Sequence, residues 1–148
     1  MSSMSQDSEE FISAFNGSFT SALRWPQLDQ LWSAVLAQAE EGWYIYAIGE
    51  VLPDRPVSVK DLERFVDEMD DFLHREHDET YCGIVYADDL KKPDFIKIYD
   101  PHNLGVSCGF SHNPPLPGWV LSKIVPCDIP STRVLPNNRR RWWSRIFS

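Results

Sequence analysis

Apolar side chains recur at intervals of three and four residues over two N-terminal segments, and this period predicts helices. The first segment covers residues 8–23, although the pair Asn16 and Gly17 weakens its centre. The second begins near Pro26, a residue that suits the first turn of a helix, and ends at Gly42. Its apolar stripe consists of Leu28, Leu31, Trp32, Val35, Leu36 and Ala39. The chain is therefore expected to begin with two amphipathic helices.

A strand and a third helix are predicted next. Residues 43–51 are aromatic and β-branched and too few for a helix of their own, so they favour a buried strand. Ser58, with Asp61 three positions later, resembles a helix capping box. Apolar positions at helical spacing then continue to about His74, namely Leu62, Phe65, Val66, Met69, Phe72 and Leu73. The outer face of this helix carries Glu63, Asp67, Glu68, Asp70 and Asp71.

Four further strands are predicted in the second half of the chain, at residues 81–87, 95–99, 104–110 and 119–125. The links between them are too short for helices, so neighbouring strands should run antiparallel. Residues 100–103 have turn chemistry and predict a hairpin between the second and third of these strands. The expected fold class is α+β: two N-terminal helices, then a strand, a helix and a mainly antiparallel sheet of about five strands with helices packed on one face.

The length of 148 residues fits one hydrophobic core. We expect a disordered N-terminus over residues 1–7, a single α+β domain over 8–127, and an irregular connector with a basic Trp-rich C-terminal tail over 128–148. No apolar run approaches the roughly 20 residues of a membrane span, and the first residues do not resemble a signal peptide. Three cysteines without paired spacing favour reduced thiols, so a soluble cytoplasmic protein is expected.

Charge divides the chain into an acidic body and a basic end. Residues 1–132 hold 22 acidic and 9 basic side chains, a net charge of −13, whereas residues 133–148 hold five arginines and no acid. An acidic body repels a phosphate backbone, so nucleic-acid binding by the body is not expected. Asp67, Glu68 and Asp71 are the candidate contacts for a protein partner with a basic or mixed-charge surface.

The basic tail is the second candidate surface, because tryptophan and arginine are enriched at interface hot spots. Its candidate contacts are Arg139, Arg140, Arg141, Trp142, Trp143 and Phe147. Three arrangements of this tail stay open: docking on another protein or, peripherally, on an anionic membrane, folding back on the domain's own acidic face, or full solvation.

Cysteine and histidine supply the candidates for chemistry. His74 and His77 lie one helical turn apart and Cys82 follows, so a zinc site is conceivable there. His102, Cys108 and His112 are a second group, either a nucleophilic thiol with a base or two imidazoles and a thiolate around a metal. Along a continuous strand, however, Cys108 and His112 would stand about 13 Å apart, beyond hydrogen-bond or metal reach. Paired carboxylates at Asp88 and Asp89 lack the pattern of a calcium loop.

The sequence contains no phosphate-binding glycine loop, nucleophile elbow or C-x-x-C pair. We therefore expect no cofactor, and the favoured hypothesis is a non-enzymatic protein-interaction or adaptor protein with an acidic helix face and a basic aromatic docking tail. The alternative is a small thiol- or zinc-dependent enzyme that uses Cys108 or Cys82 with a histidine.

Overall fold

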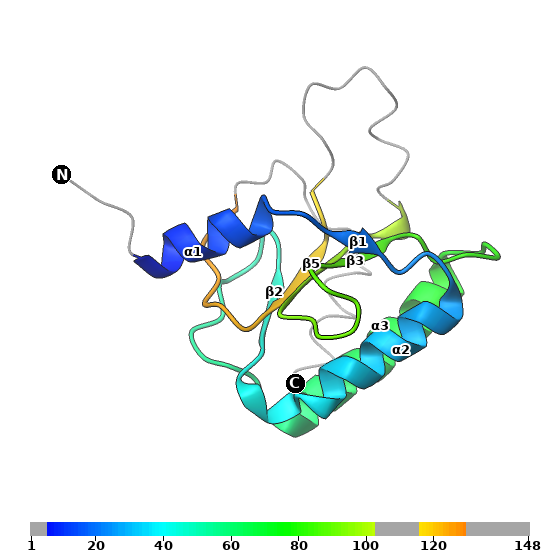
Figure 1. The fold of residues 1–148 in the computed structure, drawn as a ribbon, viewed down its shortest axis with the longest axis horizontal. Helices are drawn as coiled ribbons and strands as arrows, with labels where there is room; N and C mark the ends of the chain where they lie inside the picture. The colour runs from blue at the N-terminus through cyan, green and yellow to red at the C-terminus, as the bar shows by residue number, and fades with distance from the viewer. Residues whose placement is uncertain (1–5, 103–115, 130–148) are drawn as a thin grey trace, which may run out of the picture.

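The computed structural model describes residues 6–102 and 116–129, and it has the expected α+β class. The elements are α1 (Gln6–Phe15), β1 (Thr20–Ser21), α2 (Trp25–Ala37), the 3-10 turn η1 (Ala39–Glu41), β2 (Tyr44–Ala47), α3 (Val59–Glu76), β3 (Val85–Ala87), β4 (Phe95–Ile98) and β5 (Trp119–Ser122). Figure 1 shows the strands between α1 on one side and the pair α2 and α3 on the other.

One antiparallel sheet of five strands has the order β1-β3-β4-β5-β2. The fifth strand is β1, which the sequence did not predict, whereas the predicted strand at residues 104–110 lies outside the described residues. β3 pairs with one edge of β4 and β5 with the other. Residues 95–98 are therefore not available for the predicted hairpin with residues 104–110, and that pairing is wrong.

The larger core lies between the sheet and the pair α2 and α3. Ile45, Ile96, Ile98 and Leu121 point from the sheet into this core, and Trp119 packs edge-on against Phe72 of α3, with ring centroids 5.5 Å apart. All six apolar positions predicted for the third helix are buried: Leu62, Phe65, Val66, Met69, Phe72 and Leu73. This packing fixes α3 along its length, because amphipathic helices gain most of their stability from the buried face.

Helix α1 covers the opposite face of the sheet, so the prediction that all helices share one face is corrected. Phe11 is fully buried and its ring lies 5.2 Å from that of Phe95 and 6.5 Å from that of Tyr46. Ile48, Val120 and Ile129 belong to the same cluster. The reason is the period of two along a strand: side chains alternate between the two faces, and each face needs its own apolar cover.

The first helix ends at Phe15 rather than continuing to Leu23. Asn16 and Gly17 form the turn that ends it, and the Gly17 amide donates to the Ala14 carbonyl. Phe19 keeps its apolar role in a different setting, since its ring packs edge-on against Phe95 at 5.7 Å between centroids. The apolar spacing past residue 16 therefore reflects packing on the same sheet face rather than one continuous helix.

Both ends of the longest helix follow the sequence prediction closely. The Ser58 hydroxyl accepts a hydrogen bond from the Asp61 amide at 3.1 Å, which caps the first turn of α3. The helix reaches Glu76, two residues past the predicted end. Among the described helices, none is long and apolar enough to cross a membrane. The division of the chain into three regions stays a prediction, although Ile129 is still part of the packed body.

Candidate functional site: the outer surface of α3 and its histidine end

The solvent side of α3 is predominantly acidic, with the exposed Arg64 among its carboxylates. Its members Glu63, Asp67, Glu68 and Asp71 are exposed, and we call them the acidic α3 surface. Spacings of three and four residues place them on one side of the helix, opposite the six buried apolar residues. The three carboxylates chosen from the sequence as partner contacts, Asp67, Glu68 and Asp71, therefore lie together and face solvent.

Some of these carboxylates have a basic side chain close by, and others do not. Asp71 forms an exposed ion pair with Arg75, with Nη1 of the arginine 3.0 Å from the carboxylate oxygen. Asp67 and Glu68 have no basic side chain within 4 Å among residues 6–102 and 116–129. Exposed ion pairs contribute about 1 kcal/mol or less. The surface therefore keeps a net negative charge that a cationic partner can meet.

Aromatic and imidazole rings meet at the C-terminal end of α3. We call Leu23, Trp25, His74, His77 and Tyr81 the histidine corner. The Trp25 ring stacks on His74 at 4.0 Å between centroids, and His77 packs edge-on against Tyr81 at 6.0 Å. The indole of Trp25 also donates to the Glu79 carbonyl at 3.1 Å. These contacts join the start of α2 to the end of α3.

The histidine corner exposes apolar surface beside the acidic α3 surface. Leu23 is 52% and Tyr81 45% exposed, the largest values among the described large hydrophobic side chains outside the 49–57 loop. The backbone holds them close, because the Cys82 amide donates to the Leu23 carbonyl at 2.8 Å. Exposed aromatic residues next to charged ones are typical of protein interfaces. Sequence reasoning did not select Trp25 or Tyr81, since 56 positions separate them along the chain.

The structure gathers the zinc candidates His74, His77 and Cys82 at this corner without directing them to one point. His77 Nε2 lies 2.9 Å from the backbone carbonyl oxygen of Cys82 and therefore donates to it. His74 faces Asp70, with 3.6 Å between Nε2 and the carboxylate oxygen. No three His, Cys, Asp or Glu side chains within the described part of the chain are grouped to hold a metal ion.

The thiol of Cys82 is fully buried, and this burial raises its pKa. A raised pKa keeps the thiol protonated near neutral pH, whereas nucleophilic catalysis requires the thiolate. The thiol of Cys127 is only partly buried; it donates to the Ser8 carbonyl over 3.8 Å, and burial raises its pKa as well. Cys82 packs in the larger core, and Cys127 packs against the α1 cluster.

Several other candidates have structural partners or lie elsewhere. His102 Nε2 lies 2.5 Å from a carboxylate oxygen of Glu76, which ties residue 102 to the end of α3. The carboxylate of Asp88 accepts from the backbone amides of Asp89, Asp94 and Phe95, so it shapes the 88–94 turn. Seven tail and strand candidates fall outside the described residues, together with His112: Cys108, Arg139, Arg140, Arg141, Trp142, Trp143 and Phe147.

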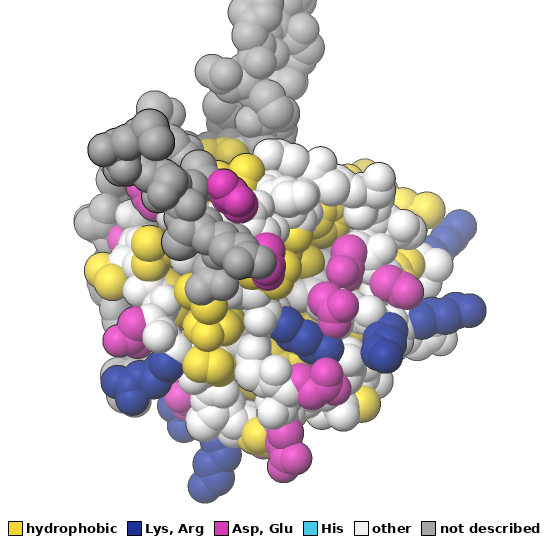
Figure 2. All heavy atoms as spheres, turned by 60° about the vertical axis from the view of Figure 1, so that its left-hand side comes forward, with side chains coloured by type: hydrophobic (Ala, Val, Ile, Leu, Met, Phe, Trp, Pro, Cys, Tyr) yellow, Lys and Arg dark blue, Asp and Glu magenta, His cyan; other side chains and the backbone are white. Residues whose placement is uncertain are grey.

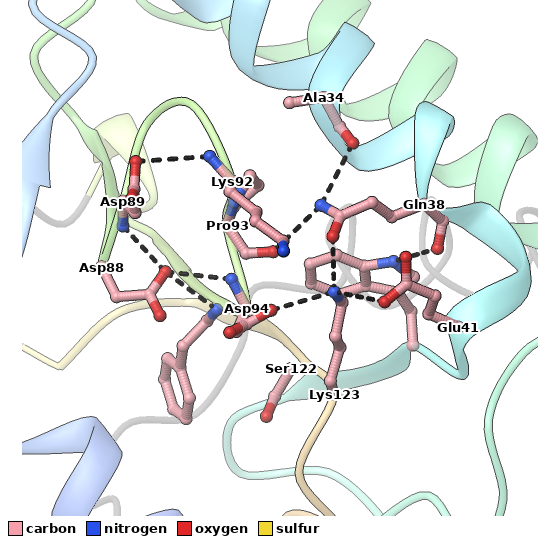
Figure 3. A network of polar contacts seen from close by, with 12 residues as sticks. Ala34, Gln38, Glu41, Asp88, Asp89, Lys92, Pro93, Asp94, Ser122 and Lys123 are labelled. Carbon is pink, nitrogen blue, oxygen red and sulfur yellow. Dashed lines mark hydrogen bonds and ion pairs between the residues drawn. The ribbon is translucent and has the colours of Figure 1, made fainter.

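A polar network around Lys123 joins β5, the end of α2 and the 88–94 turn (Figure 3). Lys123 Nζ lies 2.7 Å from the amide oxygen of Gln38, 3.0 Å from Glu41 and 2.9 Å from Asp94. Although burial opposes its charge, hydrogen bonds to Asp94 and Glu41 raise the pKa of Lys123. Gln38 also donates to the Pro93 carbonyl. These contacts hold the three segments together.

A second lysine, Lys97 on β4, lies on the α1 face of the sheet between two aromatic rings. Its Nζ is 4.2 Å from the ring centroid of Phe15 and 4.1 Å from that of Phe19. The ring faces attract the ammonium. Burial nevertheless lowers the pKa of Lys97. Neither lysine network could be predicted from the sequence, because each joins residues from distant segments.

Comparison with known proteins adds no family to this description: no protein-family model matches the chain, and no curated protein or solved structure matches it significantly.

Proposed function

We propose that this chain is a non-enzymatic protein-interaction or adaptor protein, in which the acidic α3 surface binds a basic or mixed-charge protein. The observation that carries the proposal is the position of Asp67, Glu68 and Asp71 on the solvent side of a helix whose opposite side is fully buried. A rigid helix presents these charges at fixed spacing, so little order has to be gained on binding.

The histidine corner supports the proposal because it exposes apolar and aromatic side chains next to the acidic α3 surface. Complementary charge mainly steers encounter and selects among partners, whereas buried aromatic contacts carry most of the affinity. Asp71 and His74 lie one helical turn apart, and Trp25 stacks on His74. The acidic α3 surface therefore continues into exposed rings, and one partner can contact both. The basic tail at residues 138–148 is a second, separate docking element of the same proposal.

Charge reversal on α3 tests the proposal. Asp67 and Glu68 are exposed, so the Asp67→Lys/Glu68→Lys variant should keep its unfolding free energy within about 0.5 kcal/mol for each substitution. Partners that are captured from the source cells and identified by mass spectrometry should bind the purified variant at least tenfold more weakly than the wild-type chain.

The matched control is Glu9→Lys/Glu10→Lys. It makes the same charge change at adjacent exposed residues on α1, across the sheet from α3. This control should not lose the partner. An equal loss of partner affinity in both variants would mean that only the overall charge matters, and this would contradict the proposal. Unchanged partner affinity in the α3 variant would also contradict it.

Deletion of residues 138–148 tests the tail separately. The shortened chain should fold, since the described core ends at Ile129, and it should capture less partner. Capture at the wild-type level would remove the tail from the proposed function while leaving the acidic α3 surface in place.

A further inference from the structure

A shallow groove lies between α1 and the segment that follows β5. It has a volume of about 480 Å³ and is lined by Glu9, Glu10, Ser13, Ala14 and Ile124. Figure 2 views the side of the molecule that carries the start of α1, and hydrophobic side chains are visible there between acidic ones. The groove lies on the opposite side of the sheet from α3.

The lining combines unpaired negative charge with an apolar floor. Glu9 and Glu10 are exposed, and no basic side chain within the described ranges comes within 4 Å of either carboxylate. Ala14 and Ile124 are partly buried against the α1 core. A ligand that fits this lining carries positive charge and apolar or aromatic side chains in one short segment.

The described chain ends beside this groove. Cys127 donates to the Ser8 carbonyl at the start of α1, and Ile129 is 8% exposed in the same cluster as Phe11. The last described residue, Ile129, therefore lies next to α1. The thirteen residues from Ile129 to Trp142 can span up to about 45 Å, which exceeds what is needed to return to Glu9 and Glu10.

We propose that the basic tail, residues 138–148, docks within its own chain into the groove between α1 and Ile124. Its arginines meet Glu9 and Glu10, and its tryptophans cover Ala14 and Ile124. The inference rests on the proposed function in one respect, because it takes the tail as a docking element. It adds that the groove holds the tail until a partner competes for it.

Weak intrinsic affinity is sufficient for such docking. With a connector as short as residues 130–137, the effective concentration of the tail near the groove is about 1 mM, so a dissociation constant of about 1 mM keeps half of the tails bound. An external partner at micromolar affinity can still displace the tail. The groove therefore acts as a reversible cover for the tail.

Nuclear magnetic resonance of the isotope-labelled full chain tests this docking. Backbone amide shifts of Glu9, Glu10, Ser13, Ala14 and Ile124 should differ between the full chain and residues 1–137, independently of protein concentration. A synthetic peptide of residues 138–148 added to residues 1–137 should restore the full-length shifts. The Glu9→Lys/Glu10→Lys variant should bind this peptide at least tenfold more weakly, and Asp67→Lys/Glu68→Lys should bind it like wild type.

Three results would overturn the inference: no shift difference at the groove, a difference centred on α3 instead, or shifts that grow with protein concentration and so indicate contact between copies. Glu9→Gln/Glu10→Gln repeats the test with less effect on α1, because charge reversal opposes the helix dipole. Failure here is distinct from failure of the proposed function, which is read from partner affinity. If both hold, Glu9→Lys/Glu10→Lys frees the tail and strengthens partner capture.

Discussion

Lys97 and Lys123 show how the surroundings of a single residue decide its effect on stability. Lys123 is 15% exposed and has three oxygen partners, whereas Lys97 lies between aromatic rings with no carboxylate within 4 Å among the described residues. The two pKa values shift in opposite directions, up for Lys123 and down for Lys97. Replacement by the uncharged methionine should therefore affect the two sites differently.

Lys123→Met should lower the unfolding free energy by about 1–2 kcal/mol, since it removes charge-assisted hydrogen bonds that join three segments. Lys97→Met removes a partly buried charge and loses ring contacts of comparable size, so its effect should stay within about 1 kcal/mol of zero. Urea unfolding of both variants measures the difference. Equal destabilisation by the two substitutions would contradict this account of the Lys123 network.

Cys82 gives the protein a predictable response to alkaline pH. Its thiol has a raised pKa in the folded state, so the unfolded chain releases this proton first. The contribution of the protonated thiol to the unfolding free energy is fully present below a pH of about 8.5, which is the pKa of a cysteine in the unfolded chain. This contribution is lost as the pH rises through the pKa of the thiol in the folded state. The unfolding free energy should therefore fall with pH above about 8.5, and less steeply in Cys82→Ala. Parallel slopes in the two proteins would exclude this role for Cys82.

At the scale of elements, repeated patterns could be predicted and single contacts could not. The third helix was predictable because six apolar positions and a Ser58 cap agree over five turns. β1 was not, since two residues show no period, and Thr20 and Ser21 are defined only by pairing with Ala87 and Tyr86. The spacing of Phe15 and Phe19 suggested one helix, yet both rings pack against Phe95 from separate elements.

The same distinction applies to the candidate site. The acidic α3 surface was predictable, because Asp67, Glu68 and Asp71 follow from the helical period alone. The histidine corner was not, since the stack of Trp25 on His74 joins residues 49 positions apart. The groove beside α1 was not predictable either, because it forms where Ile124, far away in the sequence, lies next to that helix.

The cap of α3 gives an element-scale prediction. Ser58→Ala removes the acceptor for the Asp61 amide and should lower the unfolding free energy by about 1 kcal/mol. Ser33→Ala, at an exposed position inside α2, is the matched control and should be neutral or slightly stabilising. Urea midpoints at unchanged slope measure both effects. A Ser58→Ala midpoint equal to that of wild type would show that the cap contributes nothing.

Docking of α1 gives the second element-scale prediction. Phe11 is fully buried between Phe95 and Tyr46, so Phe11→Ala should lower the unfolding free energy by about 3–5 kcal/mol. Ile12 is only partly buried, and Ile12→Ala should have a smaller effect. Thermal unfolding monitored by circular dichroism compares the two. A larger effect at Ile12 would mean that α1 does not pack as described.

At the scale of the whole molecule, two faces of one sheet separate two surfaces. Helix α3 presents exposed carboxylates on one side, and the groove beside α1 lies on the other. Substitutions on opposite sides of a rigid core should change stability almost additively, since distant sites share no partners. The two charge reversals therefore serve as controls for different losses: the α1 variant should not weaken partner binding, and the α3 variant should not weaken binding of the tail peptide.

The most direct test of the acidic α3 surface is the salt dependence of the association rate for the identified partner. Electrostatic steering raises this rate at low ionic strength and is screened at high salt. The wild-type rate should fall steeply between about 0.02 and 0.5 M salt, whereas the Asp67→Lys/Glu68→Lys variant should start at least tenfold slower and respond weakly. Identical rates for the two proteins at every salt concentration would contradict the proposed interaction surface.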